Sequence, residues 1–252
     1  MAVLPPGWRR IAYASLDSTN TALKRLVADG NRDLHEGLIL TAETQTAGRG
    51  RQGREWLSPT GNLYASFLIA APDELAKSPQ VGFIASVAVV DAFATPGVRL
   101  RCKWPNDVLA HGAKLCGILP ELAGTWIVLG IGLNLRPINA VGDYPITSLA
   151  EQGLTFTPDQ AVAAISGALN TRLAQWRRDG FGAIAAAWSA VGPARAEPLT
   201  VRMPQPGATP LTGRYAGLDG AGALLLDTAD GQKRILAGDV LFAAPVPAAE
   251  VV

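Results

Sequence analysis

The stretch VLAHGAKLCGILPEL, residues 108–122, decides the fold that we expect for this chain. Two apolar runs flank the dipeptide His111-Gly112, and the second run begins at Lys114. Short β runs joined by a tight turn that contains glycine predict a β-hairpin, and a hairpin pairs its strands antiparallel. The sheet that contains this segment is therefore at least partly antiparallel.

Neighbouring segments extend the predicted sheet. Residues 98–104 alternate in character, with Arg99, Arg101 and Lys103 on the outward face and Val98, Leu100, Cys102 and Trp104 on the inward face. Pro105-Asn106-Asp107 ends this strand, because proline cannot continue a ladder of hydrogen bonds. Further strands are expected at residues 8–16, 37–44, 62–70 and 126–135.

Helical segments are interspersed with these strands. A helix is expected after the capping residues 17–20, and others at 79–94, 159–179 and 181–191. The sequence thus predicts an α+β fold with a mixed, largely antiparallel sheet. After Gly192-Pro193, residues 198–243 become short β runs with glycine turns, which predicts a separate small β-barrel. We expect two domains, residues 1–193 and 194–252, and a disordered tail after Pro245.

Composition narrows the class of protein. The chain has 252 residues, 48% of them hydrophobic, and a formal net charge of +1, which fits a soluble folded protein and argues against a general nucleic-acid binder. Only two cysteines and two histidines occur, which excludes a disulfide scaffold and argues against a zinc site. No signal peptide and no apolar stretch of membrane-spanning length is visible. We expect a cytoplasmic protein that does not enter a membrane.

Positive charge is concentrated in QTAGRGRQGR, residues 45–54, which we call the arginine loop. Three interpretations are open: a solvated loop, an RNA-binding segment, or a clamp for a small anion. Guanidinium groups match carboxylate and phosphate, and glycine lets the backbone approach an anion closely. The loop is short and lies between two predicted strands, which favours a ligand-binding loop.

Other candidate residues each have a plain structural alternative. Asn106 and Asp107 form either an ordinary turn or a strand-end site in which Asp107 is a base or a magnesium contact, with Lys103 nearby as a phosphate contact. Lys114 is either a strand-edge charge or a charge aimed into a pocket. In residues 17–20, DSTN, one side chain suffices to cap a helix, which leaves the others free for a polar ligand. Gly130 and Gly132 lie inside a β run and indicate close approach of a ligand or of backbone. The third glycine of a dinucleotide-binding fingerprint is missing, which argues against a Rossmann fold.

In combination, these motifs resemble the biotin protein ligases. DSTN (17–20), QTAGRGRQGREW (45–56), NLYAS (62–66), KWPND (103–107), KLCGILPE (114–121) and GIGLN (130–134) occur in that family's order. The resemblance covers residues 8–135 specifically, and the later helices and the C-terminal part fit the family's layout with less motif support. Related lipoate and octanoate ligases share the catalytic fold and remain an alternative, as does a non-catalytic module that binds phosphate or RNA.

The resemblance implies a class II synthetase-like biotin/lipoate ligase fold with a small C-terminal SH3-like barrel. It implies an enzyme that uses ATP and Mg²⁺ to form biotinyl-5′-AMP from biotin. The biotinyl group then passes to a lysine of the biotin carboxyl carrier domain of acetyl-CoA carboxylase. Some family members carry an N-terminal DNA-binding repressor module. Because the first predicted strand begins at Trp8, we expect no DNA partner here, and we expect a monomer or a weak homodimer.

The resemblance also implies roles for individual residues. The catalytic residues are expected to be Lys114, Arg51 and Asp107, with Asp107 orienting or deprotonating the acceptor lysine, and no metal is expected to be held by protein side chains. Biotin is expected to contact Ser18, Thr19, Asn20, Gln45, Arg49, Gly50, Arg51 and Lys114. The nucleotide is expected to contact Arg49, Arg51, Arg54, Trp56, Lys103, Asn106, Lys114, Gly130, Gly132 and Asn134.

Overall fold

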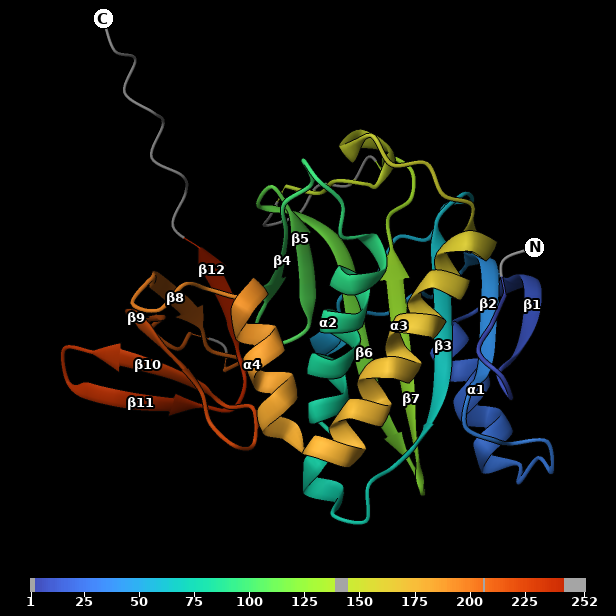
Figure 1. Ribbon diagram of the computed structural model, residues 1–252, viewed down its shortest axis with the longest axis horizontal. Coiled ribbons are helices and arrows are strands. Elements are labelled where there is room, and N and C mark those ends of the chain that lie inside the picture. Colours follow the sequence, from blue (N-terminus) through green and yellow to red (C-terminus); the bar gives the residue numbers. More distant parts are fainter. Residues whose placement is uncertain (1–2, 139–144, 206, 243–252) are drawn as a thin grey trace, which may run out of the picture.

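The computed structural model describes residues 3–138, 145–205 and 207–242, and these form two sheets and four α-helices (Figure 1). The helices are α1 (Thr19–Ala28), α2 (Gln80–Phe93), α3 (Pro158–Asp179) and α4 (Phe181–Val191). The strands of the first sheet are β1 (Arg9–Leu16), β2 (Leu38–Gln45), β3 (Leu63–Ala70), β4 (Leu100–Lys103), β5 (Asp107–Ala110), β6 (Ala113–Ala123) and β7 (Trp126–Leu133). Those of the second are β8 (Pro198–Arg202), β9 (Leu211–Leu218), β10 (Leu224–Thr228), β11 (Gly231–Ile235) and β12 (Asp239–Phe242).

The first sheet is mixed and largely antiparallel, as predicted. Its strand order is β1-β2-β3-β7-β6-β5-β4, and β1 and β2 are paired in parallel while the other neighbours are antiparallel. The predicted hairpin is β5–β6. His111 and Gly112 at its turn have φ angles of 47° and 86°, the positive values that a two-residue hairpin turn requires at both central positions.

Helices cover the two faces of this sheet differently. α2, α3 and α4 lie over one face, and α1 lies on the other (Figure 1). Side chains alternate between the faces along each strand, so Ile39 and Phe67 belong to the main core while Leu40 and Leu68 pack with Leu23 of α1. Among the described residues, no helix combines the length and apolar composition needed to cross a membrane.

The second sheet has the strand order β11-β10-β9-β8-β12 with antiparallel pairing throughout. A closed barrel requires its two edge strands to pair. Within the described ranges β11 and β12 are not paired with each other, so the predicted barrel is here a small five-stranded sheet. The tail predicted to be disordered after Pro245 lies outside the described residues.

The second sheet lies against the β4 side of the first sheet and beside α4 (Figure 1). Trp104 donates its indole N–H to the carbonyl of Gly222 at 3.1 Å, and Arg101 forms an ion pair with Glu197. The prediction that Arg101 and Lys103 face solvent was wrong. Arg101 is half-buried because Glu197 and the ring of Phe242, both beyond residue 193, contact it. Lys103 is only 3% exposed and contacts Asp107.

Candidate active site

A cavity opens on the α1 face of the first sheet. Its wall is formed by the start of α1, the arginine loop and residues of β2, β3, β5, β6 and β7, together with β12 of the second sheet. The structure brings most of the predicted site residues to its wall. These are Ser18, Thr19, Asn20, Gln45, Arg49, Gly50, Arg51, Arg54, Trp56, Asn106, Asp107, Lys114, Gly130 and Gly132.

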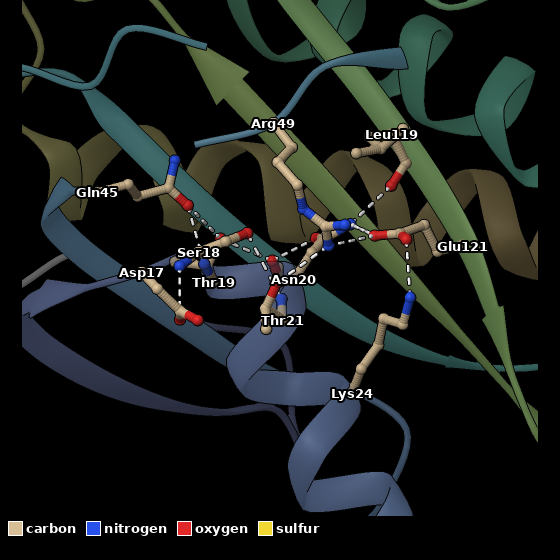
Figure 2. Close-up of polar contacts among 11 residues, drawn as sticks. Asp17, Ser18, Thr19, Asn20, Thr21, Lys24, Gln45, Arg49, Leu119 and Glu121 are labelled. Carbon is tan, nitrogen blue, oxygen red and sulfur yellow. Dashed lines mark hydrogen bonds and ion pairs between the residues drawn. The ribbon is translucent and has the colours of Figure 1, made fainter. Parts of the chain in front are cut away.

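One end of the cavity is polar and is built around the first residues of α1 (Figure 2). Ser18 is the N-cap residue and accepts from the backbone N–H of Thr21, which leaves the next two side chains free for other contacts. Gln45 accepts from the backbone N–H of Thr19 at 2.8 Å through Oε1. Its amide nitrogen donates to Ser58 at 3.0 Å. The hydrogen-bonding groups at this end are therefore held in fixed orientations.

Trp56 lies on a strip of bare backbone. A Cβ atom added to Gly132 would be 2.5 Å from the indole, and one added to Gly117 would be 2.7 Å away, so a side chain at either position would displace the ring. The indole nitrogen of Trp56 is buried and has no hydrogen-bond partner among the described residues. Lys114 Nζ is 5.3 Å from the centre of the ring. A buried donor without a partner is costly, so the geometry favours a ligand that supplies an acceptor there.

The opposite side of the cavity carries two carboxylates among a larger number of cations. Asp107 contacts Lys114 at 2.9 Å and Lys103 at 3.5 Å. Asp239 contacts Arg54 at 2.9 Å and Arg51 at 3.6 Å. The two carboxylates are thus shared by four cations, and the surplus of positive charge suits an anionic ligand.

Burial shapes the electrostatics of this cluster. Burial lowers the pKa of Lys103, and the nearby charge of Asp107 opposes that effect. Burial likewise lowers the pKa of Arg51, with Asp239 and Asp107 acting in the opposite direction. Charges in a partly desolvated site interact more strongly than charges in water, so an anion that binds here would gain more from each cation than it would at the surface.

Asn106 joins the strand end to the arginine loop. Its oxygen accepts from Arg51 at 3.3 Å, and its amide nitrogen donates to the carbonyl of Ile118. Arg51 also donates to the carbonyl of Gly238 at 3.3 Å. Asn106 therefore helps to hold Arg51 at the mouth of the cavity.

Two predicted nucleotide-binding residues, Lys103 and Asn134, do not line the cavity. Lys103 is one interaction away, because it contacts Asp107. Asn134 is 2% exposed, and its amide donates to the carbonyls of Thr147 at 3.0 Å and Lys114 at 3.4 Å. This side chain holds the segment that contains Thr147 against β6 and positions backbone behind the cavity.

Sequence reasoning missed several wall residues, namely Glu55, Tyr64, Ala65, Gly117, Ile118, Leu119, Ile131 and Asp239. Gly117 sits in the KLCGILPE motif, where a glycine inside a strand is a recognisable sign of close approach. Asp239 had no local signal, because it belongs to the second sheet and its cation partners are in the arginine loop. No group of three or more His, Cys, Asp or Glu side chains suited to a metal ion occurs in the described parts of the chain.

Comparison with known proteins defines the class. The profile of the biotin/lipoate A/B protein ligase family matches residues 12–135, and that of the biotin protein ligase C-terminal domain matches residues 200–242. The chain is 33% identical over 243 residues to a biotin–[acetyl-CoA-carboxylase] ligase from Paracoccus denitrificans, covering 91% of this chain and 98% of that protein. This chain belongs to the biotin/lipoate A/B protein ligase family.

Other relatives named as biotin ligases match over most of their length. A biotin–[acetyl-CoA-carboxylase] ligase from Mycobacterium tuberculosis is 34% identical over 250 residues, covering 93% of this chain and 90% of that protein. Among solved structures, the biotin protein ligase from Aquifex aeolicus in complex with biotin and ATP superposes with a TM-score of 0.75 at 28% identity, covering 92% of this chain and 97% of that one.

Proposed function

We propose that this chain is an ATP-dependent biotin protein ligase, which forms biotinyl-5′-AMP and transfers the biotinyl group to a lysine of a biotin carboxyl carrier domain. One observation carries the proposal: a single cavity joins a polar end built from Thr19, Asn20 and Gln45 to a cationic end built from Arg51, Arg54 and Lys114. Such a cavity suits an acid with a polar head whose carboxylate must meet a triphosphate.

In the first step a carboxylate oxygen of biotin attacks the α-phosphorus of ATP. A new P–O bond forms, the bond to the β-phosphate oxygen breaks, and pyrophosphate leaves with the electron pair. The reactants repel each other, so the chain must mainly neutralise and align them. Lys114 and Arg51 would contact the carboxylate and phosphate oxygens, while the Trp56 ring, which packs on the backbone of Gly117 and Gly132, would border the adenylate.

In the second step the amine of a carrier lysine attacks the acyl carbon, an amide bond forms, and AMP leaves. The attacking amine must be neutral, so one proton must be removed. Asp107 is the first residue of β5, directly after the turn that follows β4, and it is already paired with Lys114 at 2.9 Å. Its proposed role is to orient the acceptor amine or take its proton once the adenylate draws Lys114 away.

Mg²⁺ would accompany ATP, where it supplies charge neutralisation of the phosphates. The cavity wall carries the carboxylates of Asp107, Asp239 and Glu55, and the described residues hold no group of three or more His, Cys, Asp or Glu side chains suited to a metal ion. This donor set fits an ion bound mainly by phosphate oxygens and water, which is the usual mode for Mg²⁺ with nucleotides.

Partner and organisation follow from the same reaction. The acceptor that we propose is the carrier domain of acetyl-CoA carboxylase, as the names of the Paracoccus and Mycobacterium relatives indicate. We propose a ligase domain of residues 1–193 and a small domain of residues 194–252, which supplies Asp239 to the cavity. The free cysteines Cys102 and Cys116 are both buried, which fits the cytoplasm as its compartment.

The deciding experiment is ATP–pyrophosphate exchange with biotin, with lipoate, or without an added acid. We expect exchange that depends on biotin, followed by a mass increase of one biotinyl group on a carrier domain but not on the same domain with its acceptor lysine replaced by arginine. Exchange with lipoate alone would overturn the substrate, and no exchange by folded protein would overturn the activity.

A further inference from the structure

Glu121 of β6 connects three groups at the polar end of the cavity (Figure 2). Its Oε2 atom accepts from Asn20 Nδ2 at 2.8 Å and lies 3.6 Å from Arg49 Nη2. Its Oε1 atom accepts from Lys24 Nζ at 2.8 Å. One carboxylate therefore contacts two residues of α1 and one of the arginine loop.

These contacts determine which way the Asn20 amide faces. Its Nδ2 atom also lies 3.2 Å from the carbonyl oxygen of Leu119. A carboxylate and a carbonyl can only accept hydrogen bonds, so the amide nitrogen must face Leu119 and Glu121, and both of its hydrogens are used. The Oδ1 atom consequently faces Ser66, whose hydroxyl lies 2.6 Å away.

Asn20 therefore presents only an acceptor to a ligand. It lines the cavity, its two donor hydrogens are committed, and a carbonyl oxygen with one hydrogen bond can accept a second. The oxygen is closely confined, because a Cβ atom added to Gly130 would lie 2.5 Å from it. A ligand group with an N–H satisfies this atom, whereas the ring of lipoate, which carries two sulfur atoms, has no donor to offer.

We propose that Glu121 is a positioning residue that sets acid specificity: by holding the Asn20 amide in one orientation, it makes the polar end of the cavity select an acid whose head group donates an N–H. This proposal rests on the proposed function in that biotin, with its ureido N–H groups, is taken as the acid. Glu121 itself contacts no substrate and acts through Asn20.

The charge state of Glu121 supports this role. Burial would raise the pKa of Glu121, but the hydrogen bonds from Lys24 and Asn20, together with the charges of Lys24 and Arg49, outweigh it and hold that pKa below its usual value. The carboxylate is thus ionised at neutral pH and accepts from Lys24 and Asn20 at once. Lys24 and Asn20 contact different oxygens of Glu121, and a neutral amide replaces one of these oxygens with an NH2 group that can only donate, so it cannot accept from both in this geometry.

The test compares Glu121→Gln with Lys24→Met, a matched control that removes one partner of Glu121 and leaves Asn20 untouched. The biotin affinity of each protein is measured by calorimetry without ATP, and the KM values for biotin and ATP by exchange. In Glu121→Gln we expect biotin affinity to fall by about tenfold or more, with kcat and the KM for ATP changed by less than about twofold. Lys24→Met keeps the parental biotin affinity. An unchanged affinity in Glu121→Gln, an equal loss for ATP, or the same loss in Lys24→Met overturns the proposal.

Two further measurements separate positioning from a general structural effect. In an Asn20→Ala background, Glu121→Gln has no further effect on biotin affinity if it acts through Asn20, whereas additive losses contradict the proposal. The second measurement uses biotin analogues in which either ureido N–H is replaced by oxygen. We expect the loss of affinity relative to biotin to be smaller in Glu121→Gln than in the parent protein, and an equal loss in both contradicts the proposal. Parental protein that binds biotin without catalysing exchange would refute the proposed function and leave these binding tests intact.

Discussion

Arg54 of the arginine loop contacts Asp239 of β12 at 2.9 Å, although 185 residues separate the two along the chain. Asp239 is well covered, with its side chain 15% exposed, and it also lies 3.6 Å from Arg51. A carboxylate of the second sheet therefore holds two arginines at the mouth of the cavity. When an anionic ligand enters, its oxygens compete with Asp239 for the same guanidinium groups.

We expect Asp239→Asn to make the arginine loop more mobile and to strengthen the binding of anionic ligands. Without ligand, we expect trypsin to cleave at Arg51 and Arg54 about three to five times faster, because an ion pair with one half-exposed partner, here Arg54, contributes up to about 1 kcal/mol. Pyrophosphate and ATP should bind more tightly, because the internal competitor is gone. Limited proteolysis and calorimetry measure the two effects.

Asp230→Asn, in an exposed turn of the second sheet, is the control and should change neither quantity. Faster cleavage together with weaker nucleotide binding would show instead that Asp239 merely maintains the fold of the second sheet.

Lys114→Ala should lower the rate of adenylate formation by about a hundredfold or more, the range for removing one group that stabilises developing charge. Biotin binding should persist, because the polar end built around α1 is unaffected. Single-turnover formation of biotinyl-5′-AMP measures the rate, and Lys233→Ala, on the exposed face of β11, is the control. Near-parental turnover by Lys114→Ala would mean that this lysine is only a charge at the strand edge.

Gly130→Ala and Gly132→Ala should separate the two halves of the cavity. The new methyl group lies 2.5 Å from Asn20 Oδ1 in the first variant and 2.5 Å from the Trp56 indole in the second. We therefore expect Gly130→Ala to raise mainly the KM for biotin and Gly132→Ala mainly the KM for ATP, each by about tenfold or more, since overpacking costs about 1–3 kcal/mol. Equal effects of both variants on both substrates would contradict this division.

The two thiols should be inert in the folded protein. Burial raises the pKa of Cys102 to about 12, and it also raises the pKa of Cys116. Because the thiolate is the reactive form, alkylation by iodoacetamide at pH 8 should be slower than in urea by roughly a thousandfold. Rapid labelling of the native protein would contradict the burial of these side chains.

The same thiols predict a loss of stability in alkali. Their folded pKa values lie above the ordinary value of 9.0, so the folded state holds these protons more tightly than the unfolded state does. Their contribution is complete below pH 9 and is lost as pH rises above it, at about 1.4 kcal/mol per pH unit per thiol. Urea unfolding at pH 8, 9 and 10 measures this loss, and a free energy of unfolding that is constant across the series would count against it.

The helices and strands were predicted well from the sequence because their signals, namely β runs, capping residues and glycine turns, lie within short segments. The β5–β6 hairpin followed from two β runs around His111-Gly112, and the positions of α1 and the arginine loop followed from caps and glycines. The expected exposure of Arg101 and Lys103 was wrong because alternation reports which residues share a face, but not what covers that face. Glu197 and Phe242 cover Arg101 from beyond residue 193, and Lys103 is buried beside Asp107.

The candidate site was predictable where its chemistry is concentrated in one motif and unpredictable where it is assembled from distant segments. Arg51, Lys114 and Asp107 stood out by residue type and spacing, and the structure brings them to one cavity. Asn134 stood beside two glycines that do line the cavity, but its amide is used to hold backbone. Asp239 was invisible because a lone aspartate at the start of a short strand has no distinguishing pattern.

The contacts between the second sheet and the rest of the chain also determine whether the C-terminal part of a related protein could replace it. Asp239 faces Arg54, Glu197 faces Arg101, and the carbonyl of Gly222 receives the indole N–H of Trp104. A chimaera that joins this ligase domain to the C-terminal part of another protein inherits only one partner of each pair. Grafting would therefore succeed where the incoming part restores an acidic residue opposite the arginine loop, and a module that looks separable along the sequence behaves as one unit with the cavity that it borders.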